Sequence, residues 1–353
     1  MFRISSPSSS EEDLSVHFVK IVVAATLMRA MVHLQQDAEA TPLLFTPPKP
    51  HPLVGLSLIA LSAGLASLIS TCAKYESIDL VAMEAVFWRF VVAYVFVLVL
   101  ALYGKVNLVV PWEFQGDLVG RCVFGFAAVG SLFWAISQMN MADASTIAFT
   151  SPILTCFLGA WILGELVGLV EMICAFVSLL GVVLVARPSI FFPPPIIVHG
   201  SSYAPLAALA SAVFTALSFV HLRRLKSLHY IVVTHYFLLV GAAFSGLWVL
   251  VQQGQFDLDK SSNSVAQTAI MTGFMAFLAD LALTKGLQFE GASVASVVRY
   301  LDIVLVFVWD TAILRERLSW WSVGGAVLIT LAVVVLFVRR VRQGDSRDDE
   351  TRV

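Results

Sequence analysis

The chain has 353 residues, of which 59% are hydrophobic and only 13% are charged, and its mean hydropathy is +0.87. About a quarter of the residues of a soluble domain are usually charged, so this composition excludes an ordinary soluble fold and indicates lipid surroundings. The formal net charge of -2, without a long run of Lys or Arg, excludes nucleic acid as a partner.

The cysteines and the absence of catalytic motifs narrow the function further. Cys72, Cys122, Cys156 and Cys174 lie in apolar stretches without CxxC spacing, which predicts neither a zinc site nor a disulfide framework. The sequence contains no HExxH, GxSxG or phosphate-binding GxxxxGK[ST] motif. We therefore expect no cofactor and no metal, and neither an enzyme nor an ATP-driven pump.

The first 52 residues differ in composition from the rest. Ser5–Asp13 is polar and acidic, and Thr46–Pro52 is rich in proline. The apolar stretch Ile21–Met28 is too short to cross a bilayer, which needs about 20 residues. We predict that residues 1–52 form a mostly disordered cytosolic tail, with a short interfacial helix as the alternative.

Ten apolar segments of spanning length follow this tail. They are Leu53–Ala73, Met83–Tyr103, Val119–Met139, Ala144–Gly164, Val167–Ala186, Tyr203–His221, Ile231–Val251, Gln267–Gly286, Ala292–Leu314 and Ser319–Val338. Inside a bilayer the backbone must satisfy its own hydrogen bonds, and the segments lack the alternation of barrel strands, so they are predicted to be helices.

The basic residues predict the sidedness. The Lys and Arg near the span ends are compared on the two sides. The side of the N-terminus and the even-numbered loops has nine of them, Lys49, Lys105, Arg223, Arg224, Lys226, Lys285, Arg339, Arg340 and Arg342, and the odd-numbered loops have five. Because cytosolic loops carry the excess of Lys and Arg, both termini are expected in the cytosol, with residues 341–353 as a second tail. The sequence favours the plasma membrane or an endomembrane (ER or Golgi) without deciding between them.

A shift of 151 residues superposes the two halves of the chain. Residues 53–187 fall on 204–338, which gives a first repeat of 53–187 and a second repeat of 203–340, and the Pro-rich stretch 188–202 links them. Glu165 falls on Glu316, each in a tight turn, and both are expected to be turn and cap groups. Because each half has five helices, the second enters from the opposite face. The prediction is an all-α integral membrane protein of ten transmembrane helices in two inverted five-helix repeats.

Several runs resemble a known family. Leu132–Thr146, continuing through Phe149–Ile153 to Gly164–Glu165, resembles the EamA domain of the drug/metabolite transporter superfamily. Glu290–Ile303 is similar to the G-type subgroup of the eukaryotic solute carrier family 35. The resemblance implies an EamA-like fold and a carrier of organic metabolites, whereas the substrate does not follow from it.

The two halves differ at one position that matters for the centre of the bilayer. Pro152 in the fourth span predicts a structural hinge, because proline cannot continue a helix. The corresponding residue of the ninth span is Ile303. We therefore expect a helix break in the first half only, and halves that are not equivalent at the centre.

Charged residues inside the spans are candidates for substrate binding or ion coupling, since charges are costly in the bilayer. At about 100° per residue of helix, Arg299, Asp302 and Asp310 are expected to face one side of the ninth span. The alternative is internal pairing, with Arg299 neutralised by Asp302 one turn away. Arg89 of the second span and Asp280 of the eighth could pair with each other, or Asp280 could pair with Arg299 or carry a coupling proton.

Uncharged residues near Pro152 complete the candidate site. Trp134, Gln138 and Ser151 would supply aromatic and polar groups to a cavity beside the predicted break.

The function predicted is a secondary carrier of a small organic metabolite that works by alternating access between two inverted repeats. The cationic candidates suggest an anionic substrate, such as a carboxylate. Further partners considered are the lipid bilayer, a coupling proton and a second copy in a homodimer. The alternative function is a non-transporting membrane scaffold or regulator that acts through its cytosolic tails.

Overall fold

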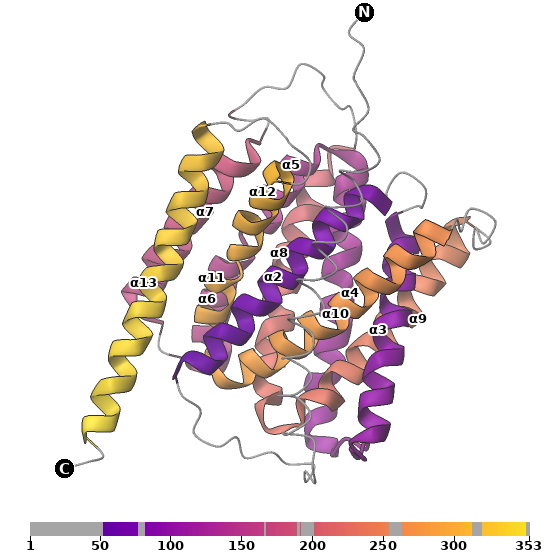
Figure 1. The fold of residues 1–353 in the computed structure, drawn as a ribbon, viewed down its shortest axis with the longest axis horizontal. Helices are drawn as coiled ribbons and strands as arrows, with labels where there is room; N and C mark the ends of the chain where they lie inside the picture. Colours follow the sequence, from indigo (N-terminus) through magenta and orange to yellow (C-terminus); the bar gives the residue numbers. More distant parts are fainter. Residues whose placement is uncertain are drawn as a thin grey trace, which may run out of the picture.

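A computed structural model describes residues 52–76, 82–165, 167–188, 191, 201–253, 263–312 and 320–350 (Figure 1). These residues form helices and no strand. The helices are α2 (Pro52–Glu76), α3 (Ala82–Tyr103), α4 (Trp112–Gln138), α5 (Met141–Ala148), α6 (Ser151–Leu163), α7 (Leu169–Ala186), α8 (Ala204–Arg224), the 3-10 turn η1 (Leu225–Ser227), α9 (Tyr230–Gln253), α10 (Asn263–Phe289), α11 (Ala292–Val298), α12 (Leu301–Ala312) and α13 (Trp320–Glu350).

Ten spans of these helices are long and apolar enough to cross a membrane. Backbone groups cannot bond to water in lipid, so apolar segments of this length are stable there as helices. The predicted fold class is confirmed: the chain is an all-α, multi-pass membrane protein of ten spans. Most of the predicted tail 1–52 and linker 188–202 lies outside the described residues, and α13 continues into the second tail as far as Glu350.

The inverted repeat is visible in the element boundaries. The helices α4 and α10 both have 27 residues, and their starts at Trp112 and Asn263 differ by the predicted shift of 151. The starts of α7 and α13, Leu169 and Trp320, differ by the same number. The helix α4 begins earlier than the predicted Val119, because it extends beyond its apolar core.

Both halves contain a broken span, which corrects the expectation of a break in the first half only. The fourth span stops at Ala148 and resumes at Ser151. The ninth span stops at Val298 and resumes at Leu301, although no proline is present there. The ninth span is therefore not continuous, and the prediction that its charges share one side of a single helix does not hold.

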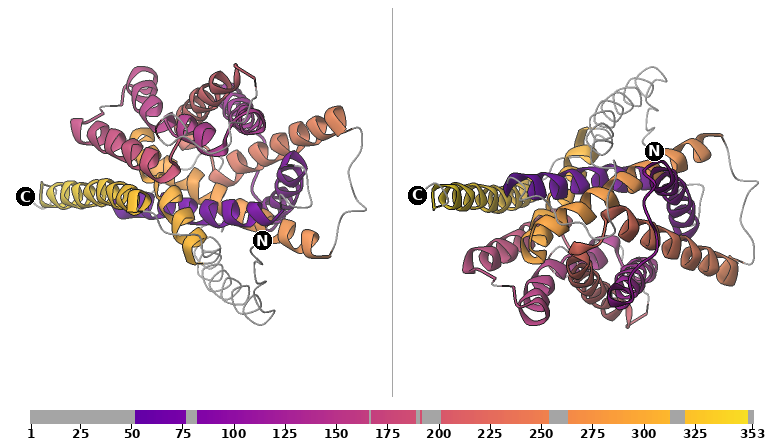
Figure 2. Two further views of the ribbon diagram at one scale, coloured as in Figure 1. Left: turned by 90° about the horizontal axis from the view of Figure 1, so that it is seen from above. Right: turned by 90° about the horizontal axis from the view of Figure 1, so that it is seen from below.

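The helices form two bundles that exchange their first helices. In bundle A, α8 packs against α4, α5 and α6; in bundle B, α2 packs against α10, α11 and α12. The two bundles lie side by side in Figure 2, and the pairs α3–α9 and α7–α13 connect them at their ends. Each bundle thus combines the helices of one repeat with the first helix of the other.

The two bundles are not equally covered. We call the face at which α2 begins and α13 ends the terminal face, and the other the opposite face. At the terminal face α11 packs against α6, and all seven residues of α11 are buried. The equivalent helix α5, at the opposite face, has Met141 60% exposed. In the described residues, the bundles are closed together at the terminal face and less covered at the opposite one.

Candidate substrate site and closed face

A buried arginine from α4 lies where the two bundles meet. The side chain of Arg121 is 4% exposed, and its Nη1 donates a hydrogen bond of 2.6 Å to Ser218 Oγ on α8. The guanidinium carbon lies 3.8 Å from the ring centroid of Phe237 on α9. Its Nη2 lies 4.0 Å from Oδ1 of Asp280 on α10, which is a contact from bundle A to bundle B. A buried charge is costly unless it is paired, so this arrangement accounts for its stability in the fold.

A glycine makes room for this arginine. A Cβ atom at Gly125, one turn further along α4, would lie 2.7 Å from Arg121 Nη1 and 2.7 Å from Phe237 Cε2. Such distances are shorter than real Cβ contacts allow, so one of these side chains would have to move. The observed position of the Arg121 guanidinium therefore requires glycine at residue 125.

A second arginine lies at the break of the ninth span. Arg299, the C-cap of α11, has its Nη2 3.9 Å from Oδ2 of Asp302. Its guanidinium carbon lies 6.0 Å from the ring centroid of Phe219, beside Ser218 on α8. Arg121 and Arg299 thus approach neighbouring residues of α8, Ser218 and Phe219. The four charged groups form one cluster, which we call the central cluster.

Both ion pairs of the central cluster are loose. Their lengths of 4.0 and 3.9 Å exceed the roughly 2.7–2.9 Å of a strong charge-assisted hydrogen bond. Two further polar atoms in the cluster, Arg121 Nε and Asp302 Oδ1, are buried without a hydrogen-bond partner. Polar groups of a ligand would supply the missing hydrogen-bond partners of these two atoms.

The partner of Asp280 differs from the predicted ones. The expectation was a pair with Arg89 or Arg299, whereas the ion pair is made by Arg121. Arg121 lies nine residues after Trp112, where α4 begins, and well inside the span. The predicted start of the span at Val119 places Arg121 near the membrane surface, where arginine side chains reach water, so the sequence does not distinguish it as a site residue.

The predicted hinge lies at the centre of the molecule, next to the two helix breaks. Tyr300 Oη donates a hydrogen bond of 2.7 Å to the carbonyl oxygen of Phe149, and the two residues are 151 apart. They are therefore equivalent positions of the repeats, and the pseudo-twofold axis passes between them. The bond satisfies a carbonyl at the end of α5, and Pro152 follows at the start of α6.

The other predicted site residues are spread over the molecule. Arg89 is half-buried on α3, which packs against α9 and α10. Trp134 is 37% exposed, and Gln138 Oε1 accepts a hydrogen bond of 3.3 Å from the backbone N–H of Ser201. Ser151 is buried in the first turn of α6. The side chain of Asp310 and all of Glu316 lie outside the described residues.

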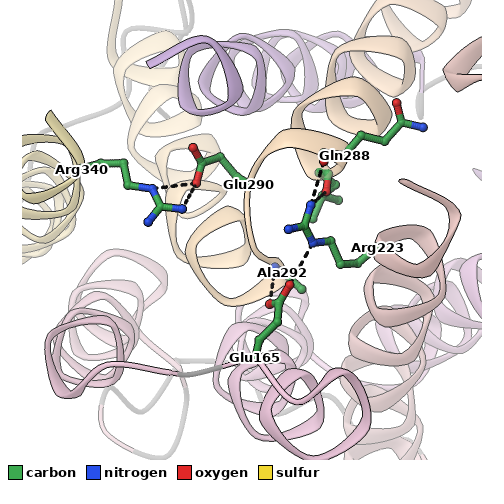
Figure 3. A network of polar contacts seen from close by, with 7 residues as sticks. Glu165, Arg223, Gln288, Glu290, Ala292 and Arg340 are labelled. Atoms are coloured by element: carbon green, nitrogen blue, oxygen red, sulfur yellow. Dashed lines mark hydrogen bonds and ion pairs between the residues drawn. The ribbon is translucent and has the colours of Figure 1, made fainter. Parts of the chain in front are cut away.

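Polar contacts close the terminal face. Glu165 Oε1 accepts a bond of 2.9 Å from Arg223 Nε, and Glu165 Oε2 accepts one of 3.1 Å from the backbone N–H of Ala292 (Figure 3). Arg223 Nη1 donates to the carbonyl oxygens of Leu287, at 3.0 Å, and Gln288, at 2.8 Å. Glu165 is a cap group, as predicted, but it caps a helix of the other bundle.

A second ion pair lies beside this group. Arg340 Nη2 and Nε donate to Glu290 Oε2 at 2.7 and 3.0 Å (Figure 3). Glu290 lies in the short connection between α10 and α11 and is 4% exposed. Burial raises the pKa of its carboxyl above the ordinary value of 4.5, and the charge of Arg340 only partly offsets this.

The described residues hold no group of three His, Cys, Asp or Glu side chains suited to a metal ion. The sequence pattern of the EamA-like transporter family matches residues 53–187 and 202–338. The chain belongs to this family. It is a membrane transporter, and the relatives named below are transporters by description rather than enzymes.

Relatives of this EamA-like transporter include animal, yeast and bacterial proteins. The chain is 29% identical over 298 residues to human solute carrier family 35 member G1, which covers 82% of this chain and 80% of the relative. The mouse protein of the same description is 28% identical over 303 residues, or 84% of this chain and 81% of the relative. The pseudopaline exporter CntI of Pseudomonas aeruginosa is 27% identical over 285 residues, or 80% and 95%.

A solved crystal structure has the same fold. It superposes with a TM-score of 0.67 at 20% identity and covers 82% of this chain and 98% of the other. At this identity the likeness concerns the fold alone.

Proposed function

We propose that this protein is a secondary carrier of a small organic metabolite with an anionic group, which it moves by alternating access between the two inverted repeats. The observation that carries the proposal is the central cluster. Two arginines and two carboxylates lie between the bundles, in loose pairs, with a buried polar atom of Arg121 and one of Asp302 unbonded. A fully structural ion pair would be expected to be short and completely bonded.

The guanidinium groups favour an anionic substrate. Arg121 and Arg299 present planar sets of donors, which suit a carboxylate better than point charges do. A substrate carboxylate would displace Asp280 or Asp302 from its arginine. The released aspartate would then bind a coupling proton, because protonation removes an unpaired charge, which is costly inside a span.

The unequal coverage of the two faces supports alternating access. Equivalent helices of the repeats, α5 and α11, differ in burial, although their lengths and positions correspond. Because the two repeats share one architecture, α5 can adopt the covered environment that α11 has here, and α11 can adopt the exposed one. The mirror state would have α5 covered and α11 exposed, with the central cluster facing the terminal side.

The descriptions of the relatives support a metabolite as the cargo. The human and mouse relatives are described as solute carriers, and the bacterial relative as an exporter of pseudopaline. We further propose, on the excess of basic residues, that the terminal face is cytosolic, and that residues 1–52, 188–202 and 341–353 lie outside the membrane.

The test is counterflow in proteoliposomes. Purified protein is first screened by thermal shift against small metabolites with and without carboxylates, and each stabilising compound is then tested for saturable, trans-stimulated exchange. The proposal predicts exchange of an anionic compound that Arg299→Ala abolishes. Binding without exchange would favour the scaffold, in which case deletion of residues 1–45 should remove activity while Arg299→Ala and Asp280→Asn do not.

A further inference from the structure

We infer that Glu165 is the latch of the terminal face: its carboxylate, held by Arg223, keeps bundle B against bundle A and so stabilises the state in which this face is closed. The inference rests on the proposed alternating access, because a latch requires a second state. It concerns Glu165, Arg223 and Ala292, which lie outside the central cluster.

Glu165 reaches both bundles from the turn between α6 and α7. Gly164 ends α6 with a positive φ of 65°, a conformation that favours glycine, and this reverses the chain and places Glu165 at the face. One carboxylate oxygen accepts from Arg223, at the end of α8 in the same bundle. The other accepts from Ala292 N–H, at the start of α11 in the other bundle.

The corner between α10 and α11 is suited to this pair of charges. The last carbonyls of a helix and its first N–H groups lack partners within the helix, and they favour a cation and an anion respectively. Arg223 occupies the carbonyl end of α10, through Leu287 and Gln288, and Glu165 occupies the N–H end of α11. The ion pair thus binds two helix ends at once (Figure 3).

The helix α11 has no side-chain cap of its own. Its N-cap residue is Gly291, so the cap comes from Glu165 in the other bundle. A Cβ at Gly291 would lie 3.1 Å from Glu165 Oε2, closer than most real Cβ contacts. Because Gly291 has no side chain, it cannot cap α11 itself, and it leaves room for the carboxylate of Glu165.

These bonds would have to break if the bundles separated at this face. Glu165 and Arg223 both belong to bundle A, whereas Ala292, Leu287 and Gln288 belong to bundle B. The neighbouring pair differs, since Glu290 lies in bundle B, between α10 and α11, and Arg340 lies on α13. It offers a matched control: a glutamate–arginine pair at the same face that includes no residue of bundle A.

The experiment measures access to α11 from the terminal face. In full-length protein with the four native cysteines replaced by serine, Ser293→Cys places a thiol on α11 at a position that is 5% exposed. Reconstituted protein is treated with a membrane-impermeant thiol reagent. We expect Glu165→Gln to accelerate labelling about tenfold, which corresponds to about 1.4 kcal/mol in the opening equilibrium. Glu290→Gln is expected to leave the rate unchanged.

Equal labelling rates in the parent protein and in Glu165→Gln would overturn the latch, as would equal acceleration by Glu290→Gln. If Glu165→Gln does not fold, Gly291→Ala provides a second test with the same expected direction, because the added Cβ pushes the carboxylate away by a few tenths of an ångström without changing any charge. Failure of the proposed function gives a different result. If Glu165→Gln accelerates labelling but the protein shows no counterflow, the latch is supported and the carrier function is refuted.

Discussion

The contact between Arg121 and Asp280 allows the structural and functional roles of the central cluster to be separated. We consider Arg121→Met, Asp280→Asn and the double variant. Methionine keeps an apolar stem but loses the guanidinium that lies over the Phe237 ring, and asparagine keeps the shape of aspartate, so each change removes the charge of one partner.

The expected magnitude follows from the distance and burial. Two unit charges 4.0 Å apart attract by about 4 kcal/mol at an effective dielectric constant of about 20. Removing one partner of a buried pair typically costs about 3–5 kcal/mol, since the other charge stays behind. The Asp280 side chain is 21% exposed, so we expect about 3 kcal/mol for Arg121→Met, at the lower end. The double variant removes both charges, and its stability should return to within about 1 kcal/mol of the parent.

The assay combines thermal unfolding with counterflow of the compound found by the screen. We expect the double variant to regain stability but not exchange, since the proposed site binds the substrate through the Arg121 guanidinium. Recovery of both would show that the pair is structural only. A double variant no more stable than Arg121→Met would refute the reasoning, because the two charges would then not be coupled.

Three further changes test other parts of the structure. Tyr300→Phe removes the bond to Phe149 and should lower the unfolding free energy by about 1 kcal/mol, measured by chemical denaturation; no loss would mean that the bond contributes nothing. Gly125→Ala should displace the Arg121 guanidinium and weaken substrate binding at unchanged net charge, as measured by titration calorimetry; unchanged affinity would contradict the assigned site. Because burial raises the pKa of Glu290, the stability that this residue contributes falls as the pH rises through its ordinary pKa to the raised one. Glu290→Gln should therefore match the parent in thermal unfolding at low pH and be at least as stable at neutral pH; lower stability at neutral pH would contradict that sign.

The repeat and the number of spans could be predicted because both depend on local composition. Apolar stretches of spanning length and a constant shift of 151 residues need no knowledge of tertiary contacts, and α4 and α10 follow that shift. The break before Pro152 also has a local cause. The break at Arg299 and Tyr300 has none in the sequence, because it is accompanied by a contact between the repeats, from Tyr300 to Phe149.

The site was harder to predict, since its contacts join residues far apart in the chain. Arg121 finds its partners on α8, α9 and α10, so only the tertiary arrangement distinguishes it from an arginine at the membrane surface. One signal was available: Gly125 follows Arg121 by one helical turn, which is the spacing at which a small residue accommodates a large neighbour. The capping role of Glu165 could be predicted from its turn, but its target on α11 could not.

Hydrogen–deuterium exchange of α5 and α11, in protein reconstituted into lipid nanodiscs, tests the central claim most directly. The claim is that equivalent helices of the two repeats exchange environments as the protein alternates. We predict that the amides of α11 exchange more slowly than those of α5 in the parent protein, and that Glu165→Gln raises exchange in α11 while lowering it in α5. Equal exchange in the parent, or changes of the same sign in both helices, would contradict alternating access.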